Sequence, residues 1–160
     1  MKIAVGMSGG VDSSVAAWLL KQEGHEVFGI TMKIWRGGNA IPLPKGNACY
    51  GPDEKEDIEQ AERLCGQIGI PYHVFDCSGR YESIVLDYFR SEYRSGKTPN
   101  PCVRCNQEMK FGLLPALARE SGLAFDKFAT GHYARVGFDE TRKRWQLKTG
   151  VDPRKDQSYF

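Results

Sequence analysis

The stretch of the sequence most suggestive of chemistry lies near its start, where Ser8-Gly9-Gly10-Val11-Asp12-Ser13 joins an apolar run to a helical pattern. Two adjacent glycines let the backbone turn sharply and point several N–H groups at an anion, and the dipole of the following helix adds to the attraction. The two common phosphate-binding patterns do not fit, because no lysine follows and because Gly6, Gly9 and Gly10 are not spaced as G-x-G-x-x-G. The sequence therefore predicts a phosphate-binding turn without its usual lysine.

The missing lysine indicates which phosphate reacts. In lysine-containing loops, that cation stabilises charge on a terminal phosphoryl group during its transfer. A loop without it suits a β,γ-pyrophosphate leaving group, held by backbone amides and by the hydroxyls of Ser8, Ser13 and Ser14, with Asp12 near a magnesium ion. We therefore expect adenylation, with attack at the α-phosphate of ATP. The alternative is an ordinary glycine-rich turn in which Asp12 or Ser13 caps the helix.

Cysteine is the second residue type that could do chemistry. The chain has five cysteines, an odd number at irregular spacing, which argues for reduced thiols rather than a disulfide framework. Cys102 and Cys105 form a Cys-x-x-Cys pair beside two prolines. Cys65 falls on a helical apolar stripe and Cys77 ends a strand, so we expect structural roles for both. Cys49 has no assignment from its context.

The elements that must position these residues alternate between strands and helices. Apolar runs at 2–5, 26–32, 72–76 and 126–131 predict strands, and periodic apolar residues between them predict helices. This alternation predicts an α/β fold with a doubly wound, Rossmann-like parallel sheet. Two segments predict loops, a long mobile one at 36–52 and a proline-stiffened one at 96–106, while residues 133–150 predict an appended β-hairpin.

Composition bounds the class of protein. A chain of 160 residues, 41% of them hydrophobic, suffices for one core, so we expect a single domain. The formal net charge of +2 neither requires nor excludes a nucleic-acid partner. Lys and Arg are concentrated, however, in residues 90–119 and 142–155. The start shows no export signal and no segment has the length of a membrane span, so we expect a soluble, cytoplasmic protein without a membrane partner. Because the chain stops at Phe160 without a cap or polar tail, we expect a fragment of a longer protein.

The glycine stretch resembles the SGGxDS signature of the PP-loop ATP pyrophosphatases. Together with TPNPCVRCNQEMKF (98–111), ATGHYAR (129–135) and KDQSYF (155–160), it resembles the tRNA-specific 2-thiouridylase family along the whole chain. In that family, ATP adenylates the C2 oxygen of a wobble uridine in tRNA, and sulfur carried on a cysteine persulfide then displaces it. The resemblance implies the adenine nucleotide α-hydrolase-like fold, ATP and Mg²⁺ as cofactors, and tRNA and a sulfur-donor protein as partners. It also implies that residues 1–160 are the N-terminal adenylation domain, without the family's central and β-barrel domains.

The resemblance assigns roles to individual positions. Cys105 matches the nucleophilic cysteine, with Cys102 beside it, and Asn100-Pro101-Cys102 matches the segment that contacts the flipped-out target base. His132 and Lys155-Asp156-Gln157 match positions that contact tRNA. We expect cations around Cys105 to bind phosphates and to lower the pKa of its thiol. The positions implied for nucleotide binding are Gly6, Met7, Ser8, Gly9, Gly10, Val11, Asp12, Ser13, Met32 and Gly131.

One position departs from the family's pattern, because many members carry an aspartate where this chain has Cys102. That aspartate is a candidate proton shuttle, so the role is in doubt here. Cys102 and Cys105 supply two soft ligands, and with a third cysteine from outside this chain they could hold an iron–sulfur cluster with one open iron for sulfide. Family members with this cysteine pattern resemble cluster-dependent enzymes. A redox dithiol or persulfide pair, and one inert cysteine, are the alternatives; a structural zinc site lacks a second ligand pair.

Two rival functions remain open. Another PP-loop enzyme could adenylate a small substrate, but such reactions use nitrogen nucleophiles and need neither Cys102 nor Cys105. A non-catalytic module could bind nucleotide and RNA without releasing pyrophosphate.

Overall fold

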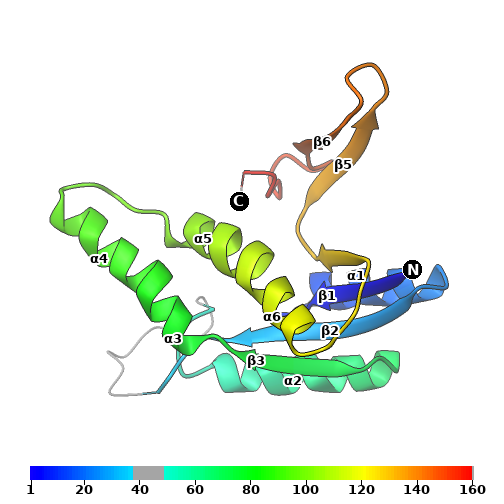
Figure 1. The fold of residues 1–160 in the computed structure, drawn as a ribbon, viewed down its shortest axis with the longest axis horizontal. Coiled ribbons are helices and arrows are strands. Elements are labelled where there is room, and N and C mark those ends of the chain that lie inside the picture. Colours follow the sequence, from blue (N-terminus) through cyan, green and yellow to red (C-terminus); the bar gives the residue numbers. More distant parts are fainter. Residues whose placement is uncertain (38–48, 160) are drawn as a thin grey trace.

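The computed structural model describes residues 1–37 and 49–159, so most of the predicted loop at 36–52 lies outside the described residues. Four parallel strands form the central sheet: β1 (Lys2–Gly6), β2 (Glu26–Lys33), β3 (Tyr72–Asp76) and β4 (Lys127–Thr130). Their spatial order is β3-β2-β1-β4, so the chain builds outward from β1 in one direction and then returns to its other side (Figure 1). The predicted parallel sheet is confirmed.

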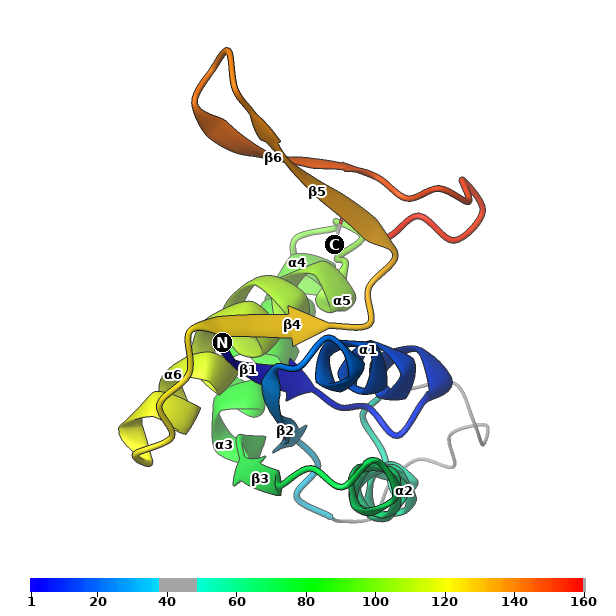
Figure 2. The same cartoon turned by 90° about the vertical axis from the view of Figure 1, so that its right-hand side faces the viewer.

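Helices cover both faces of this sheet (Figure 2). On one face, α1 (Val11–Gln22) and α2 (Glu54–Ile68) contribute Ala17, Ala61 and Cys65 to a core shared with alternate residues of β1. On the other face, α6 (Leu114–Glu120) packs Leu114 and Ala118 against Phe28 and Ile30 of β2. The central strands β1 and β2 are buried over most of their length and are nearly continuous apolar runs, as the fold class requires, whereas the edge strands β3 and β4 are only partly buried.

Two composite helices complete the second face. The first joins α3 (Ser78–Tyr81), the π-helical turn η1 (Glu82–Leu86) and α4 (Asp87–Arg94), and the second joins α5 (Pro101–Arg104), the π-helix η2 (Cys105–Leu113) and α6. They meet at a third core cluster that includes Val85 and Met109, both fully buried.

The prediction of a loop over 96–106 is wrong for its second half, because a helix begins at Pro101. Asn100 caps this helix, its Oδ1 accepting a 3.1 Å hydrogen bond from the amide of Val103. Proline suits the first helical position, since its fixed φ matches the helix and its missing N–H would have no partner there. The Cys-x-x-Cys pair therefore lies on a helix.

The predicted appendage is an antiparallel hairpin, β5 (Ala134–Asp139) with β6 (Arg144–Thr149), which extends away from the sheet (Figure 2). Phe138 pairs with Trp145 across it, and their rings meet edge to face at 5.4 Å. Within the described ranges, no helix combines the length and apolar character needed to cross a membrane.

Candidate functional site

A cavity of about 340 Å³ opens at the carboxyl end of the sheet, between β1 and its two neighbours. Ligands bind at this edge in doubly wound folds, where strand order reverses, and here the reversal occurs between β1 and β4. The lining draws on the glycine turn, β2, α2, η2 and β4. Of the residues selected from the sequence, it includes Gly6, Met7, Ser8, Asp12, Ser13, Met32, Cys105, Gly131, His132 and Gln157.

Two glycines allow the close packing that shapes this cavity. Gly9 has a φ of +76°, and a Cβ there would lie 2.6 Å from the carbonyl oxygen of Asp57. A Cβ on Gly131 would lie 2.6 Å from the amide nitrogen of Ser13. Such distances are far below van der Waals contact, so only glycine lets β4 and α2 approach the turn this closely.

The turn presents unpaired donors at the start of α1. Among the described residues, no acceptor takes a hydrogen bond from the amides of Gly9, Val11, Asp12 or Ser13. The hydroxyls of Ser13 and Ser14 instead donate to the carbonyl of Gly10, at 3.2 and 2.9 Å. Unpaired amides at the positive end of a helix of 12 residues form an arrangement that binds phosphate.

Asp12 adds a carboxylate to the same turn. Its Oδ1 accepts a 2.8 Å hydrogen bond from the hydroxyl of Tyr133, and that bond raises the pKa of the tyrosine. Carboxylate oxygens are the ligands that Mg²⁺ prefers, and the ion is usually bound through one or two of them together with substrate phosphates. The donor set therefore fits a magnesium–nucleotide complex.

Cys105 lines the same cavity, half-buried at the start of η2, whereas Cys102 is exposed and outside the lining. Burial raises the pKa of the Cys105 thiol to about 11; the ammonium of Lys110 opposes this, and Cys49 and Cys102 add to it. The expectation that neighbouring cations lower this pKa is wrong in its net direction, because desolvation of the thiolate outweighs the effect of Lys110.

Of the remaining cysteines, two lie in the core and one lines the cavity. Cys65 and Cys77 are buried in the core, as expected. Cys49, which the sequence left unassigned, lines the cavity together with Cys105. In the parts of the chain that the structure describes, no group of three or more His, Cys, Asp or Glu could hold a metal ion. An iron–sulfur cluster would need a further ligand beyond Cys102 and Cys105.

The residues selected for tRNA contact surround the cavity rather than fill it. Gln157 pairs with Tyr133 through two 2.9 Å hydrogen bonds, and Lys155 places its ammonium 5.2 Å from the centre of the Tyr133 ring. Asp156 accepts from the amides of Gly150 and Ser158 and so stabilises the turn after the hairpin. These three residues therefore hold the base of the hairpin at the rim of the cavity.

His132 lies at this rim in surroundings that favour the neutral imidazole. Its Nδ1 lies 2.7 Å from the hydroxyl of Thr130, and its ring is 5.5 Å from that of Phe111. Burial, and then the ammonium of Lys110, lower the pKa of the imidazole. A neutral ring can exchange hydrogen bonds with a base without adding charge to the site.

Sequence reasoning missed several residues of the lining. Glu54 is buried, and its Oε1 accepts a 2.6 Å hydrogen bond from the amide of Ile34. Burial raises the pKa of this carboxyl. The acidic start of α2 was the available signal, but it also suits a helix dipole and so did not single out Glu54. Other missed members of the lining are Thr31, Asp57, Lys110 and Thr130.

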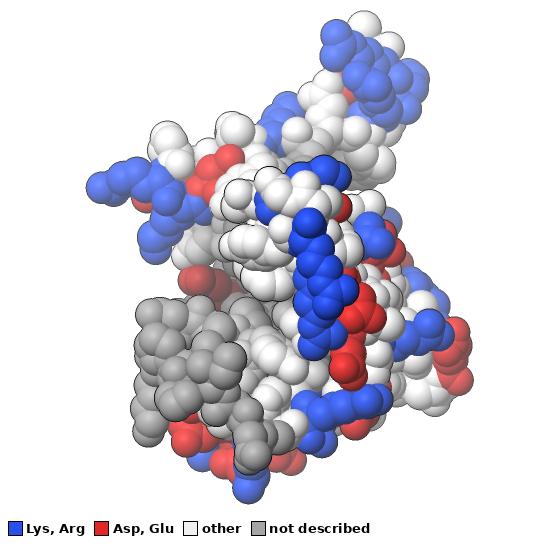
Figure 3. Space-filling view, turned by 90° about the vertical axis from the view of Figure 1, so that its left-hand side faces the viewer, with Lys and Arg blue, Asp and Glu red and all other residues white. Residues whose placement is uncertain are grey.

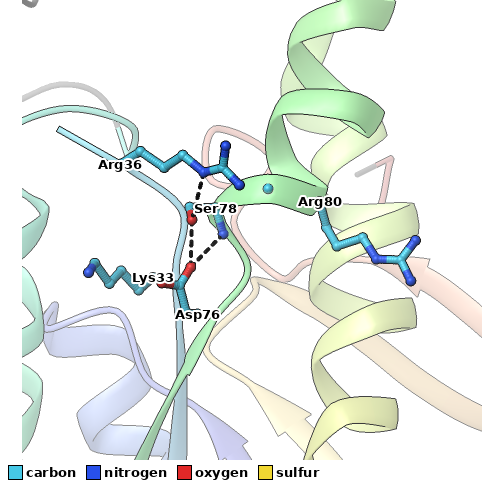
Figure 4. A pocket seen from close by; sticks show the side chains of 6 residues that line it. Lys33, Arg36, Asp76, Ser78 and Arg80 are labelled. Atoms are coloured by element: carbon cyan, nitrogen blue, oxygen red, sulfur yellow. Dashed lines mark hydrogen bonds between the residues drawn. The ribbon is translucent and has the colours of Figure 1, made fainter. Parts of the chain in front are cut away.

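A second depression, of about 540 Å³, lies beside the ends of β2 and β3 (Figure 4). Three of its polar groups bond to one another: the Ser78 hydroxyl donates to Asp76 at 2.6 Å, and Nε of Arg36 donates to Ser78 at 3.3 Å. Among the described residues that line it there is no cysteine, and the glycine turn is not part of it. The chemistry therefore belongs to the smaller cavity.

Cationic side chains are distributed unevenly over the surface. On the face shown in Figure 3, Lys and Arg cover the far end of the hairpin and form a band over the helices. The paired strands carry Arg135 opposite Lys148, with Arg144 on the same face of the hairpin. A positive arm that rises from the rim of the cavity suits an extended anionic partner.

Comparisons with known proteins agree with this geometry. The family model described as tRNA methyl transferase HUP domain matches residues 1–160. The chain is 53% identical over 163 residues to the tRNA-specific 2-thiouridylase MnmA of Endomicrobium trichonymphae, covering 100% of this chain and 44% of that protein. It is 45% identical over 158 residues to the MnmA of Clostridioides difficile (strain 630), covering 99% and 42%. The chain thus spans less than half the length of these curated relatives.

Among solved structures, the chain is similar to one described as a predicted subunit of tRNA methyltransferase from Methanocaldococcus jannaschii DSM. The TM-score is 0.51 at 23% sequence identity, over 82% of this chain and 52% of that chain. At this identity the likeness shows the fold alone.

Proposed function

The chain belongs to the family of tRNA methyl transferase HUP domains, and we propose that it is the adenylation domain of a tRNA 2-thiouridylase. The names of its relatives support this proposal, since several are tRNA-specific 2-thiouridylases matched along the whole of this chain. In the proposed reaction, the C2 oxygen of a tRNA uridine is adenylated by ATP, and sulfur then replaces that oxygen as AMP leaves. The products are 2-thiouridine, AMP and pyrophosphate.

One observation carries the proposal: the glycine turn and Cys105 line the same cavity. A carbonyl activated as an adenylate must meet its sulfur nucleophile without leaving the site, so the phosphate-binding turn and the thiol have to face each other. The unpaired amides of Gly9, Val11, Asp12 and Ser13 would hold the β- and γ-phosphates as a leaving group. Mg²⁺, when bound near Asp12, supplies charge neutralisation for these phosphates.

The remaining assignments belong to the same proposal. Met32 and Gly131 bind the nucleotide, while Asn100, Pro101 and His132 contact the target uridine. Lys155, Asp156 and Gln157 contact tRNA or hold the rim that does. A sulfur-donor protein supplies the sulfur in the cytoplasm, in keeping with five free cysteines and no disulfide.

The state of Cys102 and Cys105 is a separate part of the proposal. We favour an iron–sulfur cluster, since the two thiols lie one helical turn apart and Cys102 is open to further ligands. Anaerobic purification of the full-length protein, followed by iron and sulfide assays, tests this. Iron and sulfide that disappear in Cys102→Ser support a cluster, and the absence of both in the wild-type protein leaves a thiol or persulfide mechanism.

The function is tested by measuring tRNA-dependent pyrophosphate release and 2-thiouridine formation in the full-length protein. We expect both in the wild type, and we expect Cys105→Ser to abolish 2-thiouridine while pyrophosphate release persists. Release that a small molecule stimulates and tRNA does not would indicate a different adenylating enzyme. Tight tRNA binding without any release would indicate a binding module, and either result overturns the proposal.

A further inference from the structure

The cavity contains a lysine that the glycine turn lacks. Among the described residues of its lining, Lys110 is the one side chain with a permanent positive charge. The same lining contains three carboxyl groups, those of Asp12, Glu54 and Asp57. A nucleotide triphosphate would bring further negative charge into this space, so the position of a single cation matters for where charge can develop.

The π-helical winding of η2 brings Lys110 to the cavity. Lys110 follows Cys105 by five residues, and in an α-helix two such residues point about 140° apart. Residues 105–113 instead form a π-helix, in which residue i+5 bonds back to residue i and so lies over it. The wider turn thus directs both side chains into the same cavity, and π-helical turns occur frequently at functional sites.

Among residues 1–37 and 49–159, Lys110 has no hydrogen-bond or ion-pair partner that would explain its place. Its side chain is half-buried, yet no described residue accepts a hydrogen bond from its ammonium or forms an ion pair with it. The groups that respond to its charge are Cys105, on its own helix, and His132, at the end of β4. The charge of Lys110 therefore acts on two sides of the cavity, the one formed by η2 and the one at the end of β4.

We propose that Lys110 supplies, from a second helix, the cation missing from the glycine turn, and that it contacts the non-bridging oxygens of the α-phosphate during adenyl transfer. This inference rests on the proposed function. In the step, the C2 oxygen of the uridine forms a bond to the α-phosphorus, the bond from that phosphorus to pyrophosphate breaks, and the uridine N3 proton leaves to solvent. The amides at the start of α1 hold the leaving pyrophosphate, so the α-phosphate lies between them and the uridine presented beside Cys105.

An ammonium aimed at this point stabilises the transition state more than bound ATP, because negative charge on the α-phosphate oxygens increases as the fifth bond to phosphorus forms. In this proposal the amides at the start of α1 hold the pyrophosphate and Lys110 contacts the α-phosphate. This division explains why the lysine is on η2 and not on the glycine turn. A cation on the turn itself would stabilise the terminal phosphoryl group, which does not move in this reaction.

Lys110→Gln and Lys110→Arg in the full-length protein test the inference, with Lys127→Gln as the matched control. Lys127 is exposed at the amino end of β4, opposite the edge where the cavity opens. We expect Lys110→Gln to lower kcat for tRNA-dependent pyrophosphate release by about 10²–10³-fold, with little change in KM for ATP. Lys110→Arg should recover part of this loss, and Lys127→Gln should match the wild type.

Circular dichroism and the unfolding midpoint show whether each variant is folded. Unchanged kcat in folded Lys110→Gln overturns the inference. So does a variant that releases pyrophosphate normally but fails to thiolate, because Lys110 would then act on Cys105 rather than on the phosphate. Absence of tRNA-dependent release in the wild type would overturn the proposed function itself, an outcome distinct from both.

Discussion

The hydroxyl of Tyr133 donates a 2.8 Å hydrogen bond to Oδ1 of Asp12, a residue 121 positions away in the sequence. Gln157 bonds to the amide and the carbonyl of the same tyrosine. The glycine turn, the base of the hairpin and the segment after it are therefore joined at one residue. We therefore expect a substitution at Tyr133 to alter the amide hydrogen exchange of both the phosphate-binding turn and the hairpin.

Tyr133→Phe tests this junction. Loss of the hydroxyl removes the bond to Asp12, while the ring and the two backbone bonds to Gln157 remain. We expect faster amide hydrogen exchange at residues 11–13 and 133–135 and no change in the unfolding midpoint, because the bond is at the surface. Asp12→Asn retains an acceptor for the hydroxyl and serves as control. Equal exchange in Tyr133→Phe and the wild type would show that the bond does not couple the two segments.

Gly131 should tolerate no side chain. A Cβ there would lie within 3 Å of Ser13 N, Asp12 C and Ser13 Cα, all of them backbone atoms that cannot rotate away. We expect Gly131→Ala to cost about 1–3 kcal/mol of unfolding free energy and to weaken ATP binding, because β4 and the turn must separate. Urea unfolding and nucleotide titration measure the two effects.

The matched control for this substitution is Gly137→Ala in the hairpin. The nearest atom to its Cβ would be Nζ of Lys148 at 3.5 Å, the end of a flexible side chain. We expect a change within about 0.5 kcal/mol. If both alanine variants lose the same stability, crowding against the turn is not the reason for glycine at 131.

Comparison of the sequence with the structure shows where pattern reasoning succeeds. Apolar runs located every strand of the sheet, and the signal is clearest for β1 and β2, which are buried over most of their length and so have little choice of residue. Which residues of α1 are buried is harder to predict from the sequence. Val15 and Trp18 are about half exposed, whereas Ser13 and Ser14 are buried beneath the turn. Small polar residues are buried there because they serve the turn's own hydrogen bonds, which apolar periodicity does not register.

The site was predictable only where its residues are local in sequence. The glycine turn is a contiguous motif, so its role follows from a single stretch. Lys110 and Glu54 reach the cavity through tertiary packing and, for Lys110, through a π-helical turn that no composition rule predicts. The net change in the pKa of the Cys105 thiol also could not be predicted from the sequence, since burial raises this pKa and a nearby cation lowers it.

Glu54 should make stability depend on pH. Burial raises the pKa of its carboxyl above the unfolded value of 4.5, so between these two pKa values the unfolded state binds fewer protons than the native state. The stability that the Glu54 carboxyl contributes is therefore fully present below pH 4.5, and it is lost as the pH rises through the native pKa. The difference in unfolding free energy between the wild type and Glu54→Gln should be larger at pH 4 than at pH 7.

Glu54→Ala gives the companion measurement. It leaves the amides of Ile34 and Trp35 without their acceptor in a buried place, so we expect a loss of about 1–3 kcal/mol at every pH. Urea unfolding from pH 4 to pH 7 tests both variants. A wild-type advantage over Glu54→Gln that does not vary with pH would mean that this carboxyl titrates as it does in the unfolded chain.

In the protein without a bound cluster, Cys105 should react slowly with alkylating agents before substrate binds. With a pKa of about 11, only about one thiol in 10³ is ionised at pH 8, and the thiolate is the reactive form. We expect iodoacetamide to modify the exposed Cys49 and Cys102 before Cys105, and the rate for Cys105 to rise about tenfold per pH unit up to about pH 11.

Mass spectrometry of the cysteine peptides gives each rate, and buried Cys65 and Cys77 report any unfolding. A Cys105 rate that levels off near pH 7 would contradict the prediction and indicate a thiol activated in the free protein. If Cys105 acts as a free thiol, a raised pKa also slows its reaction with electrophiles other than the adenylated base and its oxidation between turnovers.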